Sequence, residues 1–323
     1  MPALIKRIRA QQCPVPFEIL SVNNDSDDNT LDVLAKLTRE AGAPLRFGTE
    51  YRKGIVSVRN RVLAEGLGGE LLVMMDDNEL PRPGFLSAVV ACFEAYPEAG
   101  FIGGQVEVDF AESDRPRWLS NDLLGFLAAT DNGDQGFWVE DERTPLWTSN
   151  IAYRSSLFMT PPELRFDFRY DRVGKGVGGG EDMIMFRELR RLGIPTRYCP
   201  EMIVDHAMES WRLHPWYFLK LNCKSGFRQG RWELGDYQHG ILGVPAFLFG
   251  QLLAQAGRTI SMLAGRQPGV VLRQAMTADH AIGIIAGCHA RWRASQKGAG
   301  KIAEDSLLSN LLVQRSAHAL QLC

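Results

Sequence analysis

Apolar and polar residues alternate over the first two hundred positions in segments that predict strands and helices in turn. Residues 17–23 (FEILSVN) form a short β-prone run, and the polar segment after them leads into a helical pattern over residues 30–42. The same order recurs with a helical pattern at 55–68, an apolar strand at 70–76 and a helical pattern at 85–100. This alternation predicts an α/β fold with a mostly parallel sheet flanked by helices.

After about residue 210 the pattern changes to long helical stretches without strands. We therefore predict an α/β domain over residues 1–210 and a helical C-terminal extension over residues 211–323. An uncharged stretch before residue 258 contains Pro245, which weakens its interpretation as a membrane span. The extension either rests on an anionic bilayer or packs as a helical subdomain. The first alternative is favoured by basic residues that outnumber the single acidic Asp279: Arg258, Arg266, Arg273, Arg291, Arg293, Lys297 and Lys301.

The composition is that of an ordinary globular protein, with 45% hydrophobic and 23% charged residues and a formal net charge of -2. This charge balance argues against nucleic-acid binding, which needs a basic excess. The six cysteines form no CxxC pair, so we predict free thiols and neither a zinc site nor a disulfide framework. No apolar segment of a secretory signal follows the basic N-terminal residues, and we expect a cytoplasmic protein.

Adjacent carboxylates follow a predicted buried strand in LLVMMDDNELPRPGFL, at Asp76 and Asp77, with Asn78 next. These residues could begin a turn and cap the next helix. Two like charges at the end of a buried strand repel each other, however, and a divalent cation would offset that repulsion. His206 ends a further β-prone segment, PEMIVDHAM, and is either a structural residue or a second ligand of such a cation.

Glycines precede two acidic residues at a predicted helix start in GKGVGGGEDMIMFRELRRLG. Gly179 and Gly180 stand directly before Glu181 and Asp182. Glycine lets the backbone approach a ligand closely, and a helix N-terminus adds the positive end of a dipole. The alternative is a loop followed by an acidic first turn that complements the helix dipole.

Taken in order, these segments resemble the inverting glycosyltransferases of family 2, which have the GT-A fold, and among them the bacterial exopolysaccharide type related to succinoglycan synthesis. The resemblance covers about residues 17–232. It rests on EILSVNNDSDDNT, SVRNRVLAEG, LLVMMDDNELPRPGFL, WTSNIAYRSSLF, GGGEDMIMFRELRRLG and the strand that ends at His206. It implies a GT-A Rossmann-like sheet and an enzyme that moves a sugar from a nucleotide-sugar donor to a glycan or polyprenyl-linked acceptor, in the cytoplasm or peripherally on the cytoplasmic face of the inner membrane.

The resemblance also implies roles for single residues. Asp77, Asn78 and His206 match the positions that hold Mg²⁺ or Mn²⁺ in the family. Asp182, preceded by Glu181, matches the general base that takes the proton of the acceptor hydroxyl. Donor and acceptor are expected at Asn23, Asn24, Arg59, Asn60, Asp76, Thr148, Asn150, Gly179 and Gly180.

Three features depart from the family pattern. Asn23 replaces the usual acidic residue that binds uracil, so a uridine donor is not implied. The chain begins at a predicted helix where the family begins with a strand, and we expect a native segment upstream. RQGRW at residues 228–232 has the glutamine and arginine one position too close for the QxxRW element of processive synthases, which favours transfer of a single sugar. Two alternatives remain: a degenerate member that binds a nucleotide or a partner without catalysis, and a metal-dependent nucleotidyltransferase.

Overall fold

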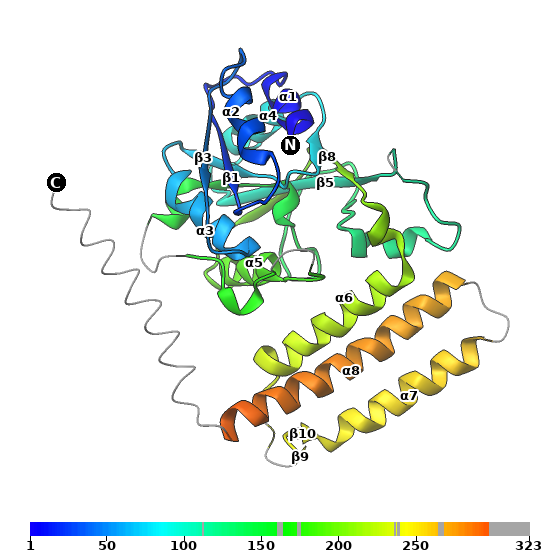
Figure 1. The fold of residues 1–323 in the computed structure, drawn as a ribbon. Helices are drawn as coiled ribbons and strands as arrows, with labels where there is room; N and C mark the ends of the chain where they lie inside the picture. The colour runs from blue at the N-terminus through cyan, green and yellow to red at the C-terminus, as the bar shows by residue number, and fades with distance from the viewer. Residues whose placement is uncertain are drawn as a thin grey trace. The chain divides into compact units, whose positions relative to one another are not determined.

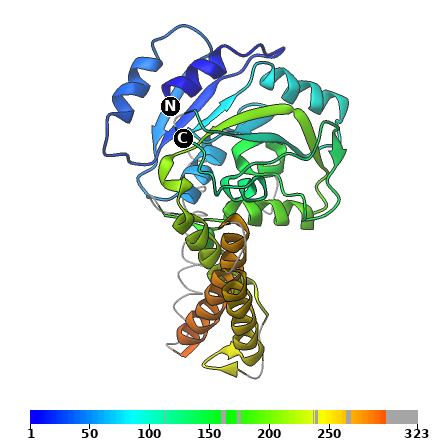
Figure 2. The same ribbon diagram turned by 90° about the vertical axis from the view of Figure 1, so that its right-hand side faces the viewer.

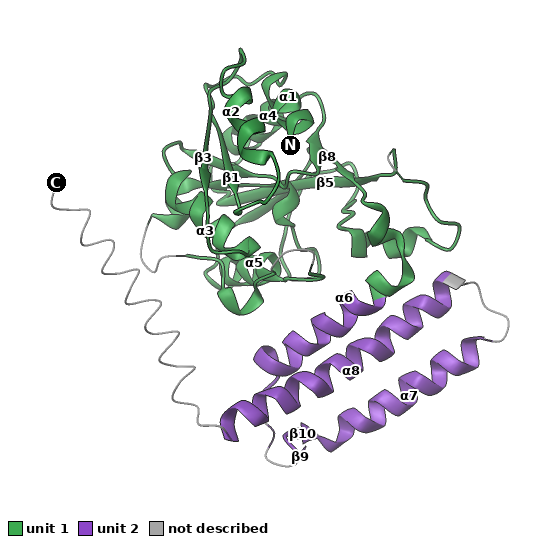
Figure 3. Ribbon diagram, viewed as in Figure 1, with its two compact units in different colours: residues 1–218 green, residues 219–323 purple. Residues whose placement is uncertain are grey.

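The computed structural model describes residues 1–111, 113–159, 164–172, 176–235, 237, 240–263 and 268–296. The chain divides into two compact units, Met1–Phe218 and Leu219–Cys323, which we call unit 1 and unit 2 (Figure 3). We predicted the division near residue 210. Of the basic residues predicted in the extension, Arg266, Lys297 and Lys301 lie outside the described residues.

Unit 1 is built around a mixed six-stranded sheet flanked by helices (Figures 1 and 2). The strand order is β3-β7-β5-β8-β4, and β6 pairs with β8. In this sheet β5 and β8 run parallel, whereas the other described pairs are antiparallel. The α/β class is therefore confirmed, but the prediction of a mostly parallel sheet is wrong, because β4, β6 and β7 each run antiparallel to the strands they pair with. The strands are β3 (Leu71–Met74), β4 (Glu79–Pro81), β5 (Phe101–Asp109), β6 (Phe137–Trp138), β7 (Ile151–Arg154) and β8 (Thr196–Ala207).

Two further strands of unit 1 form a separate parallel pair near the N-terminus. Ile19 of β1 pairs with Leu45 of β2, and a helix covers the pair on one side through Ile5. Arg9 at the end of this helix donates hydrogen bonds to the backbone oxygens of Leu37 and Ala43. The elements are α1 (Pro2–Arg9), β1 (Ile19–Asn23), α2 (Thr30–Leu37) and β2 (Leu45–Thr49).

Helices cover both faces of the large sheet because neighbouring strand residues point to opposite sides. On β5, Phe101 belongs to one apolar cluster and Ile102 to the other. Helices α3 (Ile55–Glu65) and α5 (Glu181–Arg191) contribute to the first cluster, and α4 (Phe85–Ala95) contributes to the second. Short 3₁₀ turns connect these elements at Asn121–Leu127, Thr148–Asn150, Ser155–Phe158, Phe168–Tyr170 and Ser210–Leu213.

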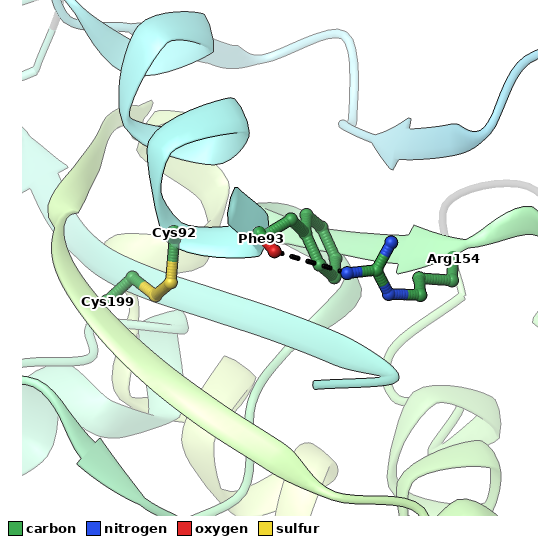
Figure 4. The surroundings of a disulfide bond; sticks show 4 residues. All are labelled: Cys92, Phe93, Arg154 and Cys199. Atoms are coloured by element: carbon green, nitrogen blue, oxygen red, sulfur yellow. Dashed lines mark hydrogen bonds between the residues drawn. A yellow bond between two sulfur atoms is a disulfide. The ribbon is translucent and has the colours of Figure 1, made fainter. Parts of the chain in front are cut away.

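A disulfide joins α4 to β8 through Cys92 and Cys199 (Figure 4). The prediction that all cysteines are free thiols is therefore wrong for this pair. The two residues are 107 positions apart in the sequence, and only the packing of α4 on β8 brings them together. Figure 4 also shows Arg154, which donates a hydrogen bond to the backbone oxygen of Phe93 at 3.2 Å and so ties β7 to the end of α4.

Unit 2 is mainly helical. It contains the end of α6 (Pro215–Arg228), a π-helical turn η6 (Gln229–Glu233) formed by most of the RQGRW segment, and the helices α7 (Ala246–Leu263) and α8 (Pro268–Gln296). A short hairpin of β9 (Gly240–Ile241) and β10 (Val244–Pro245) precedes α7 and corrects the expectation of an extension without strands. Among the described helices, none combines the length and apolar character that a membrane crossing requires.

Candidate active site

The acidic loop lies where two strands of the large sheet meet. After β3 the chain turns through Asp76, Asp77 and Asn78 and enters β4, which pairs antiparallel with β8. In this register Glu79 lies opposite His206. Strand pairing therefore places the acidic loop beside the end of β8, as the metal-site hypothesis requires. The side chain of Asp77 is exposed, whereas Glu79 is fully buried.

His206 is buried, and both of its ring nitrogens have partners. Nδ1 lies 3.1 Å from the backbone oxygen of Leu127, which can only accept, so Nδ1 carries the proton. Nε2 then presents a lone pair and accepts a hydrogen bond from Asn78 Nδ2 at 2.9 Å. Burial lowers the pKa of His206, and the charge of Arg212 lowers it further. A neutral imidazole is the form that binds a cation, although the Nε2 lone pair is engaged by Asn78 in this structure.

Arg59 on α3 connects the acidic loop to the start of α5. Its Nη1 lies 2.6 Å from Glu181 Oε1, and its Nη2 lies 3.7 Å from Asp76 Oδ1. Burial of Arg59 works to lower the pKa of the guanidinium, but the carboxylates of Glu181, Asp76 and Asp182 outweigh burial and raise that pKa. The buried guanidinium therefore stays charged and holds these acidic groups together.

The first turn of α5 separates its two carboxylates into different surroundings. Gly180 precedes the helix with a φ of 91°, and a side chain at Gly179 would come within 2.0 Å of Glu181 Oε2. Glu181 is buried, which raises the pKa of its carboxyl, while Arg59 opposes this rise. Asp182 is partly exposed, and its Oδ1 accepts the backbone N–H of Met183 at 2.8 Å. Glu181 thus acts as the partner of Arg59, and Asp182 is the carboxylate nearer to solvent.

A cavity of about 2020 Å³ opens at this edge of the sheet. Asn23 Nδ2 and Thr148 Oγ1 border it and are buried without a hydrogen-bond partner in the described part of the chain, so both are available to a ligand. The predicted site residues that line the cavity are Asn23, Asn24, Arg59, Asp76, Asp77, Asn78 and Thr148. Those outside its lining are Asn60, Asn150, Gly179, Gly180, Glu181, Asp182 and His206.

Three of the predicted substrate-binding amides have partners within the protein. The side chains of Asn24 and Asn60 tie loops together, and that of Asn150 holds strand backbones. These contacts account for the burial and polarity of the three amides without a ligand, except at Asn150 Oδ1, which is buried without a hydrogen-bond partner in the described part of the chain. The bonds run from Asn24 to the backbones of Glu50, Arg52 and Gly54, from Asn60 to both backbone groups of Phe166, and from Asn150 Nδ2 to the carbonyl oxygens of Gln105 and Met202.

Among the basic side chains of the cavity that the sequence analysis missed, three come from loops and turns: Lys53, Arg172 and Arg212. Arg212 Nη1 lies 3.4 Å from His206 Nε2, and its Nε lies 3.2 Å from Glu209 Oε2. No spacing in the sequence relates these residues, which come from separate loops and turns. Lys53 Nζ also lies 3.6 Å from Asp25 Oδ2 and 3.7 Å from Asp27 Oδ1. The charges of the three residues make the cavity suitable for an anion such as a diphosphate.

The donor atoms of the acidic loop fit a hard divalent cation. Among the described residues, no three His, Cys, Asp or Glu side chains converge as a metal site. A cation shared with a diphosphate needs only one or two protein ligands, and Asp77, the Oδ1 of Asn78 and the Nε2 of His206 offer oxygen and nitrogen atoms of the required kind. For His206 to bind a cation, Asn78 must give up its present hydrogen bond.

Comparison with known proteins gives one family and several distant structural relatives. No curated protein matches the sequence. The similar solved structures include GalNAc-T7 with UDP, GalNAc and Mn²⁺ (12% identity, 59% of this chain and 38% of that chain, TM-score 0.43). They also include S. aureus TarS 1–349 in complex with UDP (13% identity, 92% of this chain and 88% of that chain, TM-score 0.47). A third is the mannosyltransferase PcManGT from Pyrobaculum calidifontis with GDP-Man and Mn²⁺ (16% identity, 97% of this chain and 76% of that chain, TM-score 0.45). Residues 3–230 match the sequence model of the glycosyltransferase-like family 2, and because this match covers most of the chain, the chain belongs to that family.

Proposed function

We propose that this chain is a metal-dependent, inverting glycosyltransferase with a GT-A arrangement. It moves a sugar from a nucleoside diphosphate donor to a hydroxyl group of a glycan or lipid-linked acceptor in exopolysaccharide or cell-surface synthesis. The observation that carries the proposal is the contact of Arg59 with both Asp76 and Glu181, because it joins the acidic loop to the start of α5 beside the cavity. Membership of the family supports glycosyl transfer.

The donor occupies the polar end of the cavity. Asn23 offers a buried, unpartnered Nδ2 to the nucleobase, and Lys53, Arg172 and Arg212 place positive charge near the diphosphate. Mg²⁺ or Mn²⁺, held by Asp77 with Asn78 and His206, would neutralise charge that develops on the leaving diphosphate. The protein side chains bind and orient the donor around this centre.

Asp182 is the general base of the proposed reaction. The acceptor oxygen attacks the anomeric carbon from the face opposite the leaving group, while the Asp182 carboxylate accepts the hydroxyl proton. The bond between the anomeric carbon and the diphosphate oxygen breaks, and its electron pair leaves with the nucleoside diphosphate. A single displacement of this kind inverts the anomeric configuration. The buried pair of Arg59 and Glu181 fixes the helix start on which Asp182 stands.

The test is sugar transfer and donor hydrolysis across a panel of nucleotide sugars with Mn²⁺, Mg²⁺ or EDTA. We expect Asp182→Asn to lower turnover by about 10²–10⁴-fold, as loss of a general base does, with donor binding retained. Asp77→Ala should lower both turnover and the response to Mn²⁺. Asp32→Asn, on the exposed face of α2, is the matched control and should leave activity unchanged. Donor binding without turnover under all conditions would favour the degenerate, binding-only alternative.

The proposal includes peripheral contact of unit 2 with the cytoplasmic face of the inner membrane. On helix α7 the exposed fractions of Leu253, Ile260 and Leu263 are 74%, 69% and 66%, which is high for large apolar side chains. Arg258 is exposed on the same helix. Co-sedimentation with phosphatidylglycerol vesicles tests this contact. Binding should weaken in the variant Leu253→Ser/Ile260→Ser, and equal sedimentation of both proteins would contradict it.

A further inference from the structure

Glu79, which directly follows the acidic loop, carries its carboxyl group into the interior of unit 1. The residue is 0% exposed and lies on β4, which pairs with β8. Among the described residues no basic side chain forms an ion pair with it, and the buried Arg59 pairs with Glu181 and Asp76 instead. A buried carboxyl without a cationic partner costs free energy that leucine at the same strand position would not. The stability of the sheet therefore does not explain Glu79.

Two hydrogen bonds between Glu79 and Asp76 close the acidic loop. The backbone N–H of Glu79 donates to the backbone oxygen of Asp76 at 3.2 Å, as in a β-turn over residues 76–79. In return, Glu79 Oε2 accepts the backbone N–H of Asp76 at 3.1 Å. A single residue thus holds the turn through both its backbone and its side chain.

Asp77 and Asn78 are the two central residues of this turn, so the directions of their side chains depend on its geometry. At the second half of the turn, the backbone oxygen of Asn78 accepts the N–H of Ala207 on β8 at 2.8 Å. At the first half, the Asp76 amide finds its acceptor in the Glu79 side chain. The turn is therefore fixed to the sheet at one end by a strand backbone and at the other by a buried carboxyl.

We propose that Glu79 is a positioning residue, which holds the turn at residues 76–79 in the form that presents Asp77 and Asn78 to the divalent cation of the donor complex. This role rests on the proposed function, because the same cation is concerned. Glu79 acts through the Asp76 amide and neither binds the cation nor moves a proton. An apolar residue in its place would take the acceptor from that amide and let the turn adopt other conformations. Cation binding would then weaken although the sheet loses no stability.

The test compares the unaltered chain with Glu79→Leu and Glu79→Gln. Mn²⁺ binding is measured by electron paramagnetic resonance in the presence of UDP, and hydrogen exchange of the Asp76 amide is measured without metal or nucleotide. In Glu79→Leu we expect Mn²⁺ to bind about tenfold more weakly and the Asp76 amide to exchange about tenfold faster, as loss of one hydrogen bond implies. The Tm of Glu79→Leu should equal or exceed that of the unaltered chain.

The conservative variant and a control separate this role from a structural one. Glu79→Gln keeps an oxygen that can accept the Asp76 N–H, so both readouts should stay within about threefold of the unaltered chain. Thr196→Val removes a buried hydroxyl that donates to the backbone oxygen of Ile194, at the opposite end of β8 from His206. It should leave Mn²⁺ binding unchanged, whatever its effect on the Tm.

Unchanged Mn²⁺ binding in Glu79→Leu would overturn the proposal and leave the proposed function intact. A lower Tm or a failure of Glu79→Leu to fold would also overturn it, because the carboxyl would then serve the fold. Equal weakening in Glu79→Gln and Glu79→Leu would show that the hydrogen bond to Asp76 is not the cause. An unaltered chain that binds no Mn²⁺ with UDP would instead remove the cation from the proposed function, and the role of Glu79 with it.

Discussion

Arg59 is the residue on which the candidate site depends most. It is buried, and its guanidinium contacts Glu181 directly and Asp76 at 3.7 Å, while the ring of Phe166 lies 5.5 Å from it. The loop and the helix that it joins are about a hundred residues apart in the sequence. A buried ion pair contributes little net stability, but removal of one partner leaves the other charge buried without compensation. The pair therefore fixes an arrangement more than it adds free energy of folding.

We predict that Arg59→Leu lowers the free energy of unfolding by about 3–5 kcal/mol at pH 7, because the Glu181 carboxylate loses its cation. The double variant Arg59→Leu/Glu181→Leu should recover a large part of this loss. Arg61→Leu is the matched control on the same helix, because its pair with Glu65 is partly exposed and should contribute less than about 1 kcal/mol. Urea unfolding measures all of them, and equal losses for Arg59→Leu and Arg61→Leu would contradict the prediction.

At the scale of elements, the packing of η6 and the end of α6 against α8 depends on glycines at both sides of the contact. A Cβ added at Gly283 would lie 2.0 Å from the backbone oxygen of Cys223, and one at Gly226 would lie 2.0 Å from that of His280. The spacing of four residues repeats on both sides, at Gly230 and Gly287. The helix backbones approach so closely that any side chain at these positions must push them apart.

We predict that Gly283→Ala destabilises unit 2 by about 1–3 kcal/mol, the usual cost of overpacking. Gly250→Ala on α7 is the matched control, because within the described residues the added Cβ would meet no atom within 4 Å apart from those of its own helical turns. That change should be neutral or stabilise the helix by about 1 kcal/mol, because alanine has a higher helix propensity than glycine. Hydrogen exchange of α8 reports both effects, and a Gly283→Ala variant as protected as Gly250→Ala would rule out the close contact.

The stability of the contact between α8 and the end of α6 with η6 is expected to depend on pH. Burial and the charge of Arg228 lower the pKa of His280, with Glu233 opposing them. The folded state therefore favours the neutral form of His280. The resulting contribution to the free energy of unfolding is complete above about pH 6.5, the ordinary pKa of histidine, and is lost as the pH falls through the lowered pKa of the folded state. We predict faster hydrogen exchange of α8 at pH 5.5 than at pH 7.5 after correction for intrinsic rates. His280→Gln should remove most of this difference and His289→Gln should not, and an unchanged difference in His280→Gln would contradict the assignment.

The sequence predicted elements better than it predicted their pairing. The periodicity of residues 55–68 and the apolar run before Asp76 correctly located α3 and β3, because both signals are local. The antiparallel insertion of β7 and the disulfide between Cys92 and Cys199 depend on contacts between distant segments, which local periodicity does not record. For the same reason Asp76 and His206 were recognised by their types and positions, whereas Arg172 and Arg212, which line the cavity, were not.

For the whole molecule, the two units differ in what a ligand is expected to do to them. The cavity, the acidic loop and His206 all belong to unit 1, whereas unit 2 contains the close helix contacts. A ligand that binds only the folded form stabilises it by about 2.7 kcal/mol when present at one hundred times its Kd. This stabilisation depends on binding and not on catalysis, so it tests the donor site independently of any acceptor.

We predict that UDP or GDP together with Mn²⁺ slows hydrogen exchange in the loop at 76–78 and raises the Tm of the chain, because the cation offsets the repulsion between Asp76 and Asp77 while it contacts the diphosphate. EDTA should remove most of the shift, and Asp77→Ala should remove its dependence on Mn²⁺. The Gly250→Ala variant should respond like the unaltered chain, since its substitution lies in unit 2. An equal shift with EDTA and with Mn²⁺ would show that Lys53, Arg172 and Arg212 bind the diphosphate without a cation, and the metal-dependent part of the proposed mechanism would then have to be abandoned.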